Sequence, residues 1–219
     1  MNAGMKTVVY ALILLGVVAP GVQGAVITFG LVTEFSGATE PEGEKPPAWL
    51  TVTVDDSSGS VLVTLAATNL TGAEKVSEWV LNLDQDLDPT QLVFTAALRS
   101  GTFDDPTPST GANLYPADGD GLYDIRFAFT FNGTLDENFT ADDAIQYTVT
   151  YDGVGTFSAE SFNCLSYPNG GSHGPYPTAA HVQSIGARED SGWITVPEPA
   201  TLVLLGLGGF GLLARRRSA

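Results

Sequence analysis

Apolar and polar residues alternate with a period of two along the central part of the chain. Over residues 122–131, aromatic and branched side chains at the odd positions alternate with smaller or polar residues at most of the even ones. The same period returns in residues 50–54, 61–65, 79–83 and 144–151. Because successive side chains of a strand point to opposite faces, this period predicts β-strands with one buried face.

The predicted strands are short and are separated by turn-forming residues. Residues 27–33, 92–97 and 156–162 are further candidates, and Gly, Asp, Asn and Pro bound most of the runs. Residues 55–59 and 132–136 are typical of hairpin turns. No stretch between the two ends of the chain shows a convincing helical period. We therefore expect an all-β fold, an antiparallel β-sandwich of the jelly-roll-like or Ig-like kind.

Two longer segments, residues 101–116 and 167–178, are rich in proline and glycine. This composition predicts surface loops, and long loops on a rigid scaffold are where binding sites usually lie. The two segments carry Tyr115, Tyr167 and Tyr176, whose rings are candidates for stacking on sugars.

The first residues of the chain have the parts of a secretory signal peptide. Lys6 precedes the apolar residues 7–19, and a Pro-Gly pair follows them. A helix of this length reaches only about 20 Å, too short to cross a hydrocarbon core of roughly 30 Å. We therefore predict a signal peptide over residues 1–24, cut by signal peptidase between Gly24 and Ala25, with export across the inner membrane. A buried N-terminal helix is the alternative.

The last residues of the chain form a second apolar segment with a basic end. A Pro-Glu-Pro triplet precedes an uncharged apolar run over residues 200–214, and three arginines follow this run: Arg215, Arg216 and Arg217. Basic residues that follow an apolar helix stay in the cytoplasm. The pattern predicts a single C-terminal apolar helix that anchors the chain in the inner membrane, with the preceding domain outside. Its length of about 22 Å is short for a permanent anchor, so we expect a transient one.

Residues 197–219 resemble the PEP-CTERM sorting signal of Gram-negative bacteria, because they contain the triplet, a glycine-containing apolar run and the arginines in this order. The resemblance implies that an exosortase, an integral-membrane processing enzyme, recognises Pro197, Glu198 and Pro199 and that the segment after them is removed. It also implies a bacterium that makes exopolysaccharide. A sortase signal has the same layout but needs an L-P-x-T-G sequence, which this chain lacks. A plain tail anchor is the remaining alternative.

Charge is distributed unevenly along the chain. The whole chain has 9 Lys and Arg against 25 Asp and Glu, a net charge of −16. Four of the basic residues but only one acid lie in the two ends, so residues 25–196 keep 5 basic and 24 acidic residues and a net charge of −19. We expect a single acidic domain there. A nucleic-acid partner is excluded because phosphate binding needs a basic patch.

Three carboxylates at the start of one predicted strand have the spacing of a calcium loop. Asp118, Asp120 and Asp124 occupy positions one, three and seven, with glycine between the first two. Carboxylate oxygens at these positions can surround a calcium ion. Position twelve of an EF-hand needs Glu but is Phe129 here, so an acidic turn without metal is the alternative. Residues 84–89 begin in a similar way, but Pro89 occupies the glycine position, which favours a turn.

No residue pattern points to catalysis. His173 and His181 lack metal-like neighbours, and the single cysteine, Cys164, lies among apolar residues, which predicts an inert thiol. The stretches at residues 76–84, 117–125, 181–186 and 191–194 are similar to domains found ahead of such sorting signals, without a defined activity. We expect a non-catalytic protein, directed to the cell surface or matrix, with a structural or adhesive role in exopolysaccharide or biofilm. A calcium- or carbohydrate-binding module is the first alternative, and a secreted polysaccharide hydrolase is the second.

Overall fold

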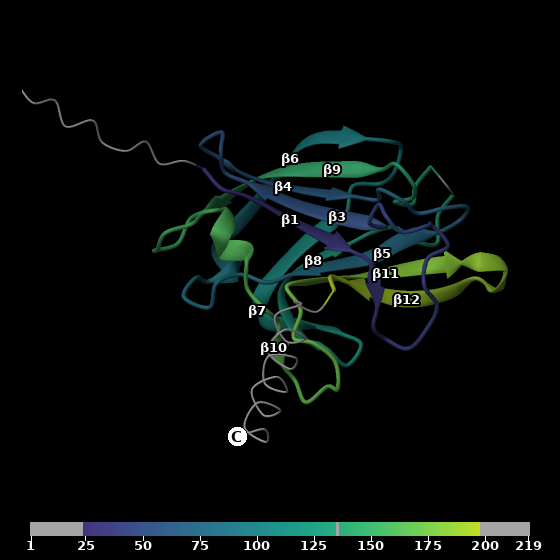
Figure 1. Ribbon diagram of the computed structural model, residues 1–219. Helices are drawn as coiled ribbons and strands as arrows, with labels where there is room; N and C mark the ends of the chain where they lie inside the picture. Colours follow the sequence, from purple (N-terminus) through teal and green to yellow (C-terminus); the bar gives the residue numbers. More distant parts are fainter. Residues whose placement is uncertain (1–23, 135, 198–219) are drawn as a thin grey trace, which may run out of the picture.

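The computed structural model describes residues 24–134 and 136–197, which fold into two antiparallel sheets packed face to face (Figure 1). The predicted all-β class with antiparallel sheets is confirmed. The predicted signal peptide up to residue 23 and the predicted C-terminal helix lie outside the described residues. Within the part that is described, no helix is both long and apolar enough to cross a bilayer.

The first sheet has five strands among the described residues, in the order β1, β3, β4, β9, β6. Their bounds are Val26–Leu31 for β1, Leu50–Asp55 for β3, Val61–Ala66 for β4, Ala144–Tyr151 for β9 and Leu92–Ser100 for β6. The strands β3 and β4 alternate strictly between buried and half-buried residues, as their sequence period predicts. They form a hairpin in which Val54 pairs with Val63, and this confirms the predicted turn at residues 55–59.

The second sheet contains the remaining strands of the described chain, in the order β10, β8, β5, β11, β12, β2. The strand β7 lies outside this order and also pairs with β8. Their bounds are Tyr167–Pro168 for β10, Gly121–Ala128 for β8, Lys75–Leu81 for β5, Thr178–Ile185 for β11, Asp190–Thr195 for β12, Thr33–Glu34 for β2 and Thr107–Ala117 for β7. Three short 3₁₀ helices complete the described fold: η1 at Pro89–Gln91, η2 at Ala159–Phe162 and η3 at Gly186–Arg188.

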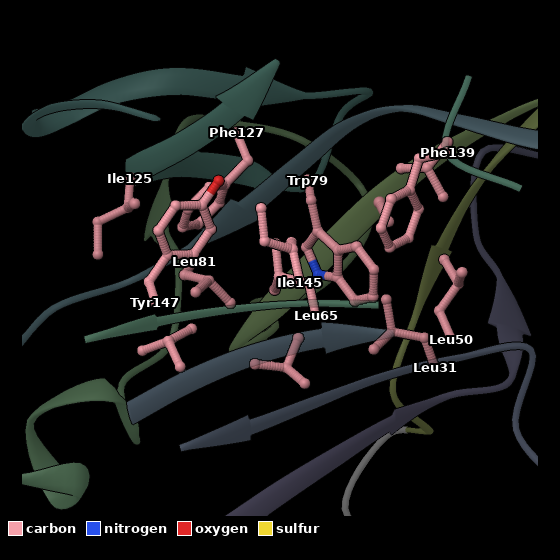
Figure 2. Close-up of a cluster of buried hydrophobic side chains, with 14 of the residues drawn as sticks. Leu31, Leu50, Leu65, Trp79, Leu81, Ile125, Phe127, Phe139, Ile145 and Tyr147 are labelled. Atoms are coloured by element: carbon pink, nitrogen blue, oxygen red, sulfur yellow. The ribbon is translucent and has the colours of Figure 1, made fainter. Parts of the chain in front are cut away.

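The core lies between the two sheets (Figure 2). Trp79 of β5 and Phe127 of β8 project from the second sheet toward Leu65 of β4 and the β9 residues Ile145 and Tyr147 in the first. Trp79 has no exposed surface, and its indole N–H donates to Thr178 Oγ1 at 3.0 Å. A smaller cluster occupies the other side of the second sheet: Phe35, Val80, Tyr115, Ala117, Tyr123, Tyr176 and Ala179.

Three predictions about local structure are wrong. Most of the segment predicted as a loop over residues 101–116 belongs to the long strand β7, whose prolines are tolerated because, among the described strands, β7 is an edge strand that pairs with β8. The strand predicted at residues 156–162 is instead η2, where Ser158 N–H donates to Ser161 Oγ at 3.1 Å. The turn at residues 132–136 joins no hairpin, because β8 and β9 belong to different sheets.

Candidate functional site

A cleft of about 630 Å³ opens beside the start of β8. Its walls come from three segments: the one after β5, which runs into η1, the one that joins η2 to β10, and the irregular middle of β7. The lining residues are Leu83, Asp84, Gln85, Leu87, Pro89, Ala112, Asn113, Asp124, Cys164, Leu165, Ser166, Tyr167 and Pro168.

Asp124 holds two walls of the cleft together. Its side chain is only 8% exposed, and its two carboxylate oxygens accept hydrogen bonds from the Leu83 N–H at 3.0 Å and the Asn113 N–H at 2.8 Å. The register of β7 shifts between Thr110 and Tyr115, which brings Asn113 opposite this carboxylate with a φ of 51°. Asp124 therefore fixes the backbone around the cleft and has no oxygen without a donor.

Asp84 is the other carboxylate of the cleft, and it is half-buried. Its Oδ1 accepts the Asp86 N–H at 3.0 Å, which closes a turn. Its own N–H donates to Ser161 O at 2.8 Å, so the turn is attached to η2. The sequence predicts Asp84 as part of a turn, and its backbone does form one. Its position in a cleft was not predicted, because the cleft also needs the distant segment that follows η2.

Cys164 lies half-buried in the same cleft. Burial raises the pKa of its thiol, and the carboxylates of Asp84 and Asp124 raise it further. A thiol in this setting is protonated at neutral pH and is a poor nucleophile, because thiolate is the reactive form. The geometry agrees with the inert thiol predicted from the sequence.

The rim of the cleft is exposed and partly aromatic. Tyr167 is 57% exposed and Leu165 is 56% exposed, while Gln85 and Asn113 present amide groups to solvent. An exposed ring beside hydrogen-bonding groups is the combination that binds a sugar, whose faces are apolar and whose edges are hydroxyl groups. Tyr115 and Tyr176, the other two tyrosines predicted for such a role, are instead buried in the smaller cluster.

The three carboxylates of the predicted calcium loop have separate surroundings. Asp118 is exposed, whereas Asp120 is buried and accepts hydrogen bonds from Tyr123 Oη and, at 3.0 Å, from Ser166 Oγ. Burial raises the pKa of Asp120, an effect that these hydrogen bonds oppose. Ser166 Oγ also accepts the Tyr176 N–H at 3.2 Å, so this network holds the segment between β10 and β11. The described residues include no group of three or more His, Cys, Asp or Glu side chains placed to bind a metal ion.

Neither His173 nor His181 lines the cleft. His181 of β11 stacks on Trp193 of β12, with ring centroids 5.0 Å apart, and its Nδ1 lies 3.2 Å from Ser77 Oγ. Burial lowers the pKa of His181, so it is neutral near pH 7. His173 packs near Phe35, with ring centroids 6.0 Å apart. Both arrangements are packing roles.

Three of the predicted processing residues, Gly24, Ala25 and Pro197, lie at the two ends of the described chain. Ala25 pairs through its backbone with Asp56, next to Gly24. At the other end, β12 finishes at the fully buried Thr195, and the exposed Pro197 follows only two residues later. Five further residues predicted for the sorting signal lie outside the described residues: Glu198, Pro199, Arg215, Arg216 and Arg217.

Comparison with protein-family models matches residues 195–217 to the PEP-CTERM protein-sorting motif. This match confirms the resemblance and begins two residues before the triplet, at Thr195, the last residue of β12. The chain is therefore an exported protein that carries an exosortase sorting motif and passes through a membrane-anchored intermediate. No curated protein and no solved structure matches the chain.

Proposed function

We propose that the acidic β domain is a non-catalytic structural or adhesive component of exopolysaccharide or biofilm, delivered to the cell surface or matrix after an exosortase removes its C-terminal segment. The observation that carries the proposal is the direct joining of the sorting motif to the folded domain. The motif match begins at Thr195, which is buried and donates from Oγ1 to Thr178 O at 2.7 Å. This joining supports delivery of the domain as the result of processing.

Replacing the triplet tests the sorting step. Changing Pro197, Glu198 and Pro199 to alanine removes the element that the exosortase is expected to recognise and leaves the apolar run intact. We expect the full-length chain to accumulate in the inner membrane and the processed form to disappear. Immunoblots of membrane, surface and medium fractions measure this change.

The control for this experiment is Pro168→Ala, which removes an exposed proline outside the motif. It should leave processing unchanged. If the alanine triplet were processed as fast as the natural chain, the proposed role of Pro197–Pro199 would be wrong. If processing stopped but the protein were never found at the surface in the natural strain, the proposed location would be wrong instead.

The cleft favours saccharide binding as the adhesive activity. Tyr167 supplies an exposed ring, and Asp84 supplies an acceptor that faces the same space. The domain carries a net charge of −19, so we propose a neutral or amino-bearing glycan rather than a polyuronate, which this charge would repel. Both oxygens of Asp124 accept backbone N–H groups, which supports binding over hydrolysis because a catalytic carboxylate pair needs both members available.

Loss of the Tyr167 ring should weaken saccharide binding. We expect Tyr167→Ala to reduce the affinity for oligosaccharides of glucosamine or N-acetylglucosamine about fivefold to tenfold, the effect of roughly 1 kcal/mol of ring contact. Calorimetry or affinity electrophoresis measures this change, with polyuronate as the anionic comparison. Leu98→Ala, on β6 and 69% exposed, is the control that should bind normally. Equal binding by both variants would place the glycan elsewhere, and release of shorter sugars would favour the hydrolase alternative.

A further inference from the structure

We propose that the carboxylate of Asp56 binds the new N-terminal ammonium group that forms when signal peptidase removes residues 1–24. The inference rests on the predicted cut before Ala25. The Ala25 nitrogen lies 2.5 Å from Asp56 Oδ1, and the Asp56 N–H donates back to Ala25 O at 3.0 Å. A carboxylate is therefore already in contact with the atom that processing converts into an ammonium.

Asp56 is held in place from three directions. It follows β3 directly, and its carbonyl accepts the Gly59 N–H at 3.0 Å in the turn that leads to β4. Its second carboxylate oxygen, Oδ2, accepts the Ala159 N–H at 2.9 Å, at the first residue of η2. Ala25 itself packs against the main core. Because both partners are already ordered, little further entropy is lost when the ion pair forms.

The chemistry of the cut converts a hydrogen bond between an amide and a carboxylate into an ion pair. Signal peptidase adds water across the Gly24–Ala25 peptide bond, so Gly24 leaves as a carboxylate and Ala25 keeps an ammonium with three N–H donors. The bond to the Asp56 carboxylate is charge-assisted on the acceptor side before the cut, and the new ammonium adds a full positive charge on the donor side. Of the acids on this turn, Asp55 directs its carboxylate to the Ser57 N–H at 2.8 Å, so Asp56 is the one that contacts Ala25.

The position of Gly24 sets the order of events. An added Cβ at Gly24 would lie 2.2 Å from Ser57 Cα, so the backbone on the leader side of the cut is covered by the turn between β3 and β4. In the folded domain this contact hinders a protease that needs an extended substrate. We infer that cleavage precedes the closure of this turn and that the new ammonium then captures Asp56 as the domain folds.

The reactivity of the N-terminal amine in the exported, processed chain tests the proposal. Mass spectrometry of the N-terminal peptide should show that the mature chain starts at Ala25. An ammonium paired with Asp56 loses its proton less readily, so acylation of this amine at pH 7 should be about tenfold slower in the native protein than in the urea-unfolded protein. This comparison uses the natural chain and does not depend on a variant that folds.

Two matched variants separate the ion pair from simple burial. Asp56→Asn keeps an oxygen acceptor and the side-chain shape but removes the charge, so it should accelerate native-state acylation severalfold. Asp55→Asn changes the adjacent, outward-facing acid and should leave the rate unchanged. A different starting residue, equal native and unfolded rates, or equal rates in the two variants would each overturn the proposal.

Discussion

Replacing Trp79 with alanine should lower the free energy of unfolding by about 3–5 kcal/mol, the usual cost of removing a large aromatic side chain from a packed core. Trp79 is fully buried at the centre of the sandwich, where residues from both sheets surround it. The substitution also leaves Thr178 Oγ1 without the indole N–H donor. The combined loss is a large part of the stability of a domain of this size.

Urea denaturation followed by far-UV circular dichroism measures this effect without depending on tryptophan emission. Trp79→Phe keeps most of the apolar volume but not the N–H donor, so it should cost clearly less than alanine. Val154→Ala, at a side chain that is 94% exposed, should change stability by less than about 0.5 kcal/mol. A loss below about 1 kcal/mol for Trp79→Ala would show that the two sheets do not pack through this residue as described.

The period of two predicts a strand well where one face meets the core and the other meets solvent. The strands β3 and β4 have this arrangement and were predicted correctly. The strand β11 does not, because Thr178, Ala179 and Ala180 at its start are all buried. Ala179 packs in the smaller cluster and Ala180 in the main core, on opposite sides of one sheet. Two buried faces remove the alternation, so local sequence could not identify β11.

The cleft was even less accessible to sequence analysis. Its walls come from residues 83–89, 112–113 and 164–168, which only the sheet order brings together. Spacing alone showed that Asp118, Asp120 and Asp124 lie close in the chain, but the turn before β8 directs Asp118 outward and buries the other two. The sorting motif was predictable because its signal is local: a triplet, an apolar run and a basic end in sequence order.

Replacing Asp124 with alanine should lower the free energy of unfolding by about 1–3 kcal/mol, because it leaves the buried N–H of Leu83 and the partly buried N–H of Asn113 without their acceptor. Each group belongs to a different wall of the cleft, so the substitution should also open the cleft and weaken saccharide binding. Denaturation and calorimetry on the same variant measure both effects. Asp118→Ala removes an exposed acid of the same motif and should cost less than about 0.5 kcal/mol.

Measurements with and without calcium distinguish this structural role of Asp124 from metal binding by Asp118, Asp120 and Asp124. If Asp124 acts only through Leu83 and Asn113, Asp124→Ala lowers the free energy of unfolding by the same amount with chelator and with millimolar calcium. Calcium then also leaves the melting temperature of the natural protein unchanged. If the three acids share an ion, calcium stabilises the natural protein by mass action, and both Asp118→Ala and Asp124→Ala abolish that gain. A calcium-dependent loss of stability in Asp118→Ala would contradict a purely structural role of Asp124, because Asp118 is exposed.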